Sequence, residues 1–348
     1  MELKELIISL CSMLSVSGYE YRSFEKLRAL VENSFDETKR DSVGNILLIR
    51  RCGRENAAKV LVDTHFDEIG MIVTGISEDG FVNIAPIGGI DPAILPSSDV
   101  VIYGEKEIRG VLSSVAPHLM KESDSKKLTE ISALFIDTGY PKQELEKIIN
   151  IGTPVGFAPV YTELLNGNLC GKSFDNKACA ASAILAVSEI SKSELAADVY
   201  LLLSAHEESV HTGGVSPAAF GIEPDYAMVI DVNLAAVPDV PKSETVEYGK
   251  GISISVSAIT DRKLTVMTEE LCHDNEIGFY RVAAPSSTGT NAAALCLVGR
   301  GVPVVDVGLP LKSMHTYSET ISLNDAHALS ALVRQFVCSE KIREAFAV

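Results

Sequence analysis

The side chains that could do chemistry in this sequence come directly after apolar, strand-like runs or at their ends. The run VLVDT is followed by His65, and the run VYLLLSA is followed closely by Glu207 and Glu208. Asp231 ends the run YAMVID, and His315 comes a few residues after VPVVDVGLP. Because the carboxyl ends of parallel strands meet at one edge of an open α/β sheet, we expect these side chains to gather there.

A further candidate, Asp175, precedes a helix that we expect over residues 177–190, where the helix dipole favours a carboxylate. Taken singly, each candidate also has an ordinary structural explanation. A buried histidine can be satisfied by a carbonyl group, and Asp is a preferred helix cap and turn residue. The adjacent pair Glu207 and Glu208 is harder to explain, because unpaired carboxylates at a buried sheet edge are costly.

Together, the candidates match the needs of two divalent metal ions. A pair of ions about 3.5–4 Å apart requires one bridging carboxylate, two terminal ligands for each ion and a free base. Two histidines and three carboxylates, with one glutamate to spare, supply that set. Imidazole and carboxylate suit zinc, cobalt or manganese, and zinc is our first expectation. Asp67, two residues after His65, can hold the second nitrogen of that imidazole.

The charge and the cysteines of the chain exclude several classes of protein. The formal net charge of -17 repels nucleic acid and anionic membranes. The first residues lack the features of a signal peptide, and no apolar run is long enough to cross a bilayer. The seven cysteines are scattered and lack CxxC spacing, as expected of reduced thiols. We therefore expect a cytoplasmic protein with no nucleic-acid or membrane partner.

The order of apolar segments indicates an α/β fold with an insertion. After residue 169, strand-like and helical segments alternate, which is typical of a sheet with helices on both faces. Between about residues 70 and 160, short β-branched runs separated by Gly, Pro, Asp and Ser indicate a small β-barrel or sandwich. The expected strands of this insertion cover residues 71–74, 81–85, 100–103 and 108–112.

The candidate motifs resemble, in order and spacing, the metal-site motifs of the M42 family of metallo-aminopeptidases, which includes glutamyl and deblocking, TET-like enzymes. The matching segments are HFDEIG at residues 65–70, GKSFDNKA at 171–178, HEES at 206–209, VIDV at 229–232 and MHTYSE at 314–319. The resemblance implies a zinc-peptidase-like α/β domain with a central mixed sheet, formed by residues 1–70 and 162–348. It also implies that residues 71–161 form an inserted β-barrel dimerisation domain, and that dimers assemble into a homo-oligomer, a dodecamer.

The resemblance further implies which residues bind the two metals. Asp175 would bridge both ions. His65 and Asp231 would complete one site, and Glu208 and His315 would complete the other.

The resemblance assigns two more residues to catalysis. Glu207 would be the general base that takes a proton from a water bridging the metals and passes it to the leaving amine. Asp67 would support His65. The expected reaction is the removal of N-terminal residues from peptide substrates.

Three other functions remain open from the residues alone. A dinuclear site could hydrolyse another amide, such as an N-acyl or blocked substrate. A metal-independent glycosidase could use Glu207 and Glu208, although neighbours on an extended segment point to opposite faces. The third is a non-catalytic binding protein. The preferred substrate side chain is also open, because the chain departs from the family pattern at His206, Lys177 and Asn291, where Gln, Arg and Asp are common.

Overall fold

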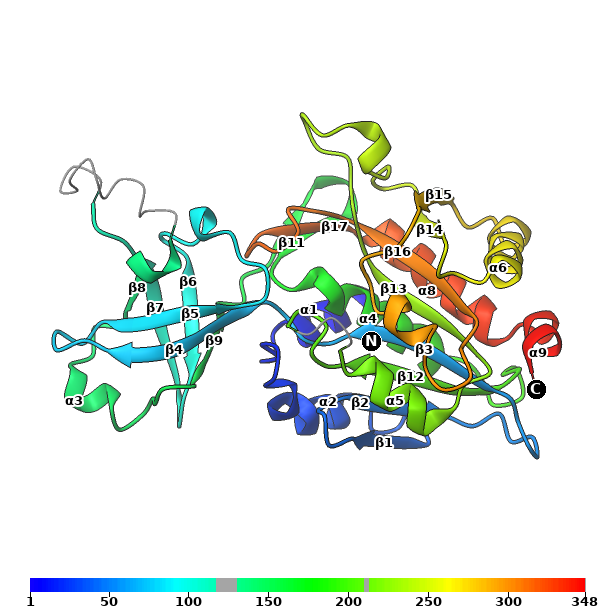
Figure 1. Ribbon diagram of the computed structural model, residues 1–348, viewed down its shortest axis with the longest axis horizontal. Coiled ribbons are helices and arrows are strands. Elements are labelled where there is room, and N and C mark those ends of the chain that lie inside the picture. The colour runs from blue at the N-terminus through cyan, green and yellow to red at the C-terminus, as the bar shows by residue number, and fades with distance from the viewer. Residues whose placement is uncertain (117–129, 210–212, 348) are drawn as a thin grey trace.

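The computed structural model describes residues 1–116, 130–209 and 213–347. Within these ranges, eleven strands form one mixed sheet, which is the largest element of the molecule (Figure 1). Its main path runs, in spatial order, through β1 (Glu37–Arg40), β2 (Ile46–Arg50), β12 (Asp198–Ser204), β3 (Lys59–His65), β13 (Tyr226–Leu234), β16 (Val304–Lys312), β17 (Glu319–Ser322), β11 (Asn168–Gly171) and β10 (Thr162–Leu164). β14 (Ile252–Ser257) branches from β16 and pairs with β15 (Phe279–Ala284).

The centre of this sheet is parallel. β3 pairs in parallel with β12 and with β13, and β13 pairs in parallel with β16. The carboxyl ends of these four strands therefore lie at the same edge, and the candidate side chains belong to that edge. The strands are buried along almost their whole length, as expected where both faces of a sheet are covered.

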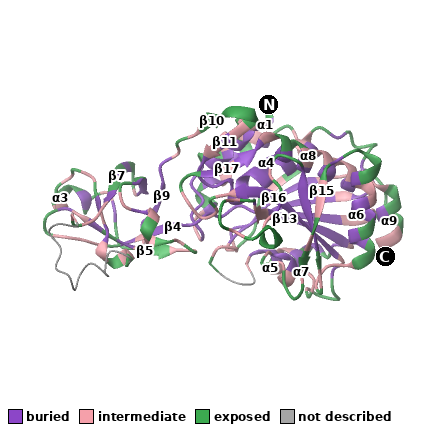
Figure 2. Cartoon of the chain, turned by 90° about the horizontal axis from the view of Figure 1, so that it is seen from above, coloured by how far each residue is buried: buried purple, intermediate pink, exposed green. Residues whose placement is uncertain are grey.

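Helices cover both faces of the sheet (Figure 2). Successive residues of β3 join different hydrophobic clusters, because side chains alternate between the two faces: Val60 and Val62 belong to one cluster and Leu61 to the other. The first cluster includes α1 (Leu3–Cys11), α2 (Phe24–Val31), α4 (Phe174–Ser188), α6 (Arg262–Asp274), α8 (Leu323–Val337) and α9 (Glu340–Phe346), and the second includes α5 (Val215–Ile222) and α7 (Ala292–Leu295).

Two helices on the first face differ in how much of their surface is buried, in line with the side chains they carry. α8 is amphipathic and buries Leu329, Leu332, Val333 and Phe336, which recur at steps of three and four residues. α4 is rich in Ala and Ser and is buried nearly all round, because it lies between the sheet and the helices α1 and α8. The N-terminal end of α4, which carries Asp175, is therefore held from several sides.

The insertion is a closed antiparallel barrel that projects from one end of the sheet domain (Figure 1). Its strands are, in order around the barrel, β4 (Gly70–Ile76), β5 (Val82–Ile87), β8 (Phe135–Asp137), β7 (Glu107–Ser113), β6 (Asp99–Tyr103) and β9 (Pro154–Phe157). The barrel has a hydrophobic core of its own, and the short helix α3 (Lys142–Leu145) packs against it through Leu145. The chain enters the barrel directly after β3.

The fold class expected from the sequence is confirmed: a mixed sheet with helices on both faces carries an inserted barrel. Of the two forms that the short strands allowed, barrel or sandwich, the barrel is the one formed. The expected strands correspond to β4, β5, β6 and β7, whereas β8 and β9 were not predicted. Among the described residues, no helix combines the length and apolar character needed to cross a membrane.

Candidate metal centre

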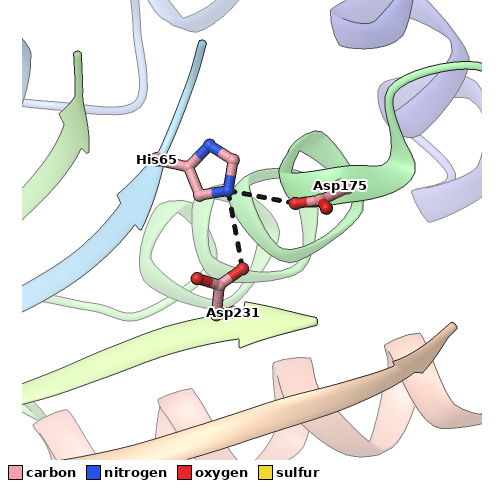
Figure 3. Close-up of side chains that lie close together, drawn as sticks. All are labelled: His65, Asp175 and Asp231. Carbon is pink, nitrogen blue, oxygen red and sulfur yellow. Dashed lines mark hydrogen bonds and ion pairs between the residues drawn. The ribbon is translucent and has the colours of Figure 1, made fainter. Parts of the chain in front are cut away.

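Three of the candidate side chains meet at the carboxyl edge of the sheet (Figure 3). His65 ends β3, Asp231 lies in β13, and Asp175 lies at the start of α4. Nε2 of His65 is 3.0 Å from Oδ1 of Asp175 and 3.5 Å from Oδ1 of Asp231. All three side chains are buried. Residues that are far apart in the sequence thus present ligand atoms to a common point.

A second group shares Asp175 with the first. Nε2 of His315 is 3.4 Å from Oδ2 of Asp175 and 3.4 Å from Oε1 of Glu208. In each group the three ligand atoms lie within 4.8 Å of one another, so the described residues contain two candidate metal sites. Asp175 directs one oxygen to each histidine, which is the arrangement that a carboxylate bridging two ions requires.

The backbone around Asp175 is not regular helix. Ser173 has a φ of 60°, and Asp175 and Asn176 have non-helical dihedral angles joined by a cis peptide bond, so regular helix begins at Lys177. The side-chain amide of Asn176 donates to the carbonyl oxygen of Ile230 in β13, 2.8 Å away. This contact ties the start of α4 to the strand that carries Asp231.

The electrostatics of the two groups favour positive charge between the carboxylates. Burial opposes protonation of His65, but the charge of Asp231 and the hydrogen bond to Asp175 raise its pKa well above its ordinary value. Hydrogen bonds to Asp175 and Glu208 raise the pKa of His315 to about 11. Although burial favours the neutral acid, the two histidines lower the pKa of Asp175. The site is therefore built to hold cationic charge, which protons supply when no metal ion does.

Glu207 lies beside the two groups and belongs to neither. Burial raises the pKa of its carboxyl to about 8, with further contributions from the negative charges of Asp231 and Glu208. Such a pKa, close to neutrality, suits a group that accepts and returns a proton. The family resemblance implied that Glu207 is the spare carboxylate, and in the structure the charges of His65, Asp231 and Glu208 act on it.

Asp67 connects the His65 segment to the Glu207 segment. Its carboxylate accepts hydrogen bonds from the backbone N–H groups of Glu207 (3.1 Å) and Glu208 (3.0 Å). Nδ1 of His65 lies 3.0 Å from the carbonyl oxygen of Asp67 and 3.6 Å from its Oδ1. Asp67 thus contacts His65, as its place in the sequence suggested, and it also holds the backbone of the two glutamates.

The three departures from the family pattern have different surroundings. Lys177 is fully buried, where its Nζ donates to the carbonyl oxygen of Met13 and pairs with Glu68. Asn291 is also buried and donates to Asp63, a residue of β3. His206 is partly buried, and its Nε2 lies 3.1 Å from the carbonyl oxygen of Val43.

Three residues near the site had no assigned role from the sequence. Glu319 accepts from the backbone N–H groups of Asp175 and His315. The carbonyl oxygen of Gly89, in the barrel, lies 3.0 Å from Nδ1 of His315. Asn45 accepts from Ala205 N and donates to Gly214 O, at the two ends of the segment that carries Glu207 and Glu208.

Of these three residues, only Glu319 could have been suspected from the sequence. It lies in the MHTYSE motif and starts the short, largely buried strand β17, where an acidic side chain is unusual. Asn45 and Gly89 act through contacts between segments that are far apart in the chain, so their spacing carried no signal.

Comparisons with known proteins place this chain among aminopeptidases. It is 29% identical over 326 residues to the lysyl aminopeptidase of Pyrococcus furiosus, covering 92% of both chains. Its structure matches aminopeptidase APDkam598 from the archaeon Desulfurococcus kamchatkensis with a TM-score of 0.90 and 28% identity, over 99% of this chain and 98% of that one. It also matches the TET1 peptidase of Pyrococcus horikoshii, which can assemble into a tetrahedron or a large octahedral shell, with a TM-score of 0.84 and 25% identity, over 97% and 99% of the two chains.

The fold and these likenesses define a zinc-peptidase-like aminopeptidase with an inserted barrel. The sequence pattern of the M42 glutamyl aminopeptidase family matches residues 44–332, and the chain belongs to this family of peptide hydrolases. The resemblance found in the sequence motifs is thereby confirmed, as is the expected enzyme class. Neither the glycosidase nor the non-catalytic binding protein is retained.

Proposed function

We propose that the chain is a dinuclear metal-dependent aminopeptidase that removes N-terminal residues from peptides. One observation carries the proposal: the two oxygens of Asp175 face two different histidines, each with a second carboxylate in range. His65, Asp175 and Asp231 would hold one ion, and Asp175, Glu208 and His315 the other. Imidazole and carboxylate donors fit zinc first, and also cobalt or manganese.

Two side chains of the proposed site have roles other than binding metal: Glu207 transfers a proton, and Asp67 holds neighbouring residues in position. When bound, the two cations supply Lewis acidity toward water, the scissile carbonyl and the free amine of the substrate. Glu207, which is not a ligand, takes the proton of the attacking water on its carboxylate and returns it to the leaving amine. Asp67 orients His65 and fixes the backbone on which Glu207 lies, so that base and ligand keep their separation.

We further propose that residues 1–70 and 162–348 form the catalytic domain, that residues 71–161 form a dimerisation domain, and that the dimers assemble further into a dodecamer. The barrel projects from the sheet domain with a core of its own, which leaves its outer surface available to a second copy (Figure 1). The shells formed by the TET1 peptidase of Pyrococcus horikoshii support such an assembly. Light scattering after size-exclusion chromatography tests it. The cytoplasmic location stays a prediction from the sequence.

A panel of aminoacyl anilides, free and N-acetylated, tests the activity. We expect hydrolysis of free anilides only, loss of activity after dialysis against a chelator, and recovery on adding zinc, cobalt or manganese. Full activity in a chain shown by elemental analysis to be metal-free would overturn the metal-dependent mechanism. Preferential hydrolysis of the acetylated substrates would instead assign the chain to the blocked-amide hydrolases that the sequence also allowed.

A further inference from the structure

The carboxylate of Glu319 connects the backbones of two proposed metal ligands. Its Oε2 accepts from the N–H of Asp175 and its Oε1 accepts from the N–H of His315, each over 3.1 Å. The residue is 2% exposed, so water does not compete for these oxygens. Neither the spacing of the motifs nor the proposed chemistry requires a carboxylate at this position.

The position of Glu319 in the sheet explains how it reaches both residues. It begins β17 and pairs with Gly171 of β11, on the segment that leads into Asp175. β17 also pairs with β16, and the turn between these two strands carries His315. Glu319 therefore lies where the segment before α4 and the turn after β16 come together.

The turn that carries His315 needs such a contact. His315 has a φ of 59° and Ser313 a φ of 58°, in the left-handed region that residues other than glycine rarely adopt. Such a conformation is unfavourable and persists only where its surroundings impose it. The hydrogen bond from the N–H of His315 to Glu319 is one contact that imposes this conformation.

The chemistry of a carboxylate suits this double contact. Both of its oxygens accept hydrogen bonds, so it satisfies two backbone N–H groups at once. A glutamine of the same shape offers one acceptor and one donor, so one backbone N–H would face an NH₂ group. A buried donor left without an acceptor costs free energy, and the backbone beside it shifts.

We propose that Glu319 is a positioning residue that sets the geometry of the second metal-ligand group, Asp175, Glu208 and His315. By holding Asp175 and His315 to one rigid carboxylate, it fixes the shared ligand relative to a terminal ligand of the second group. The proposal rests on the two-metal function proposed above and extends it to a residue outside both ligand groups. Glu319 acts through Asp175 and His315 and does not touch the reacting atoms.

Titration of Glu319→Gln with Co²⁺, in competition with a chromophoric chelator, measures the metal affinity of the variant and tests the proposal. We expect the wild-type chain to bind two ions, and the variant to bind one of them about 10- to 100-fold more weakly, the range found when outer-shell partners of metal ligands are lost. The visible absorption of bound Co²⁺ reports the change in ligand geometry independently of activity.

Asp325→Asn is the matched control. Asp325 is a buried carboxylate in α8 that likewise accepts from two backbone N–H groups, those of Gly249 and Gly251, each over 2.7 Å. Its partners belong to neither ligand group. Both substitutions therefore lower the thermal midpoint, but only Glu319→Gln is expected to change Co²⁺ affinity and absorption.

A second variant covers the case in which Glu319→Gln does not fold. Glu319→Asp keeps the carboxyl group but is one methylene too short to reach both N–H groups, so it is expected to bind the same ion more weakly. Two ions bound with wild-type affinity and absorption, in either folded variant, would overturn the role of Glu319 alone. A wild-type chain that binds fewer than two ions would contradict the proposed function, and the role of Glu319 with it.

Discussion

Nδ1 of His315 lies 3.0 Å from the carbonyl oxygen of Gly89, so a proposed ligand on the sheet domain contacts the backbone of the inserted barrel. A ring nitrogen beside a carbonyl oxygen carries the proton, and Nε2 is then left to face Asp175 and Glu208. The barrel therefore takes part in orienting the second ligand group, in addition to any part in assembly.

Substitution of Gly89 tests this contact. A Cβ atom at Gly89 would lie 3.1 Å from Nδ1 of His315, which is too close for the ring to keep its place. We expect Gly89→Ala to lower the affinity of the second ligand group for its ion about tenfold, as measured by chelator competition. Gly75→Ala is the control in the same barrel, because a Cβ there makes only an ordinary contact with Asn83 at 3.7 Å. Equal metal affinity in the two variants would contradict the orienting role of Gly89.

Glu207→Gln separates proton transfer from metal binding. Glutamine keeps the shape of the side chain but cannot accept a proton at neutral pH, so we expect kcat to fall by about 10²- to 10⁴-fold. Metal content, measured by elemental analysis, should stay at the wild-type value, because Glu207 belongs to neither ligand group. A variant that retains full activity would remove Glu207 from its role as the base.

Asp67→Asn weakens the connection between His65 and the glutamate segment. An asparagine can accept from only one of the two N–H groups, those of Glu207 and Glu208, that the carboxylate satisfies. We expect kcat to fall about 10- to 100-fold, with a smaller change in KM, because the base moves relative to the ligands. A rise in KM with unchanged kcat would show that Asp67 serves substrate binding instead.

The fold could be predicted where the pattern of side chains is unambiguous. The long apolar runs that become β3, β12, β13 and β16 and the alternation of strands with helices predicted the sheet domain. β9 was missed because it begins with Pro154 and contains Gly156, residues that are depleted in strands, although its pairing with β4 and β6 closes the barrel. Barrel closure is a tertiary event that local propensity does not encode.

The sequence could predict which side chains are candidate ligands, but not the contacts that hold those side chains in place. His65 ends β3, Asp231 lies in the second half of β13, and the pair Glu207 and Glu208 follows β12, so sheet topology alone brings them together. Spacing cannot show that a single carboxylate, Glu319, accepts from two distant backbones, or that a carbonyl of the barrel meets an imidazole. Those contacts depend on how loops pack, which the periodicity of a sequence does not contain.

Asp306 gives a prediction about stability and pH. This carboxyl is buried in β16, where its hydrogen-bond partners include the hydroxyl groups of Thr290 and Ser255, and burial raises its pKa to about 6 from an ordinary 3.8. The folded chain therefore keeps the proton up to about pH 6, whereas the unfolded chain loses it near pH 4. As pH rises through this window, the buried charge destabilises the fold, by on the order of 3 kcal/mol above pH 6.

Asp306→Asn removes this charge and keeps an acceptor for Thr290. We expect its free energy of unfolding in urea to exceed that of the wild-type chain by about 1–3 kcal/mol at pH 7.5, and to match it closely at pH 4. Asp79→Asn, at an exposed turn, controls for the loss of one charge from an acidic chain. A difference between Asp306→Asn and the wild-type chain that does not grow from pH 4 to pH 7.5 would show that Asp306 is not held neutral by burial.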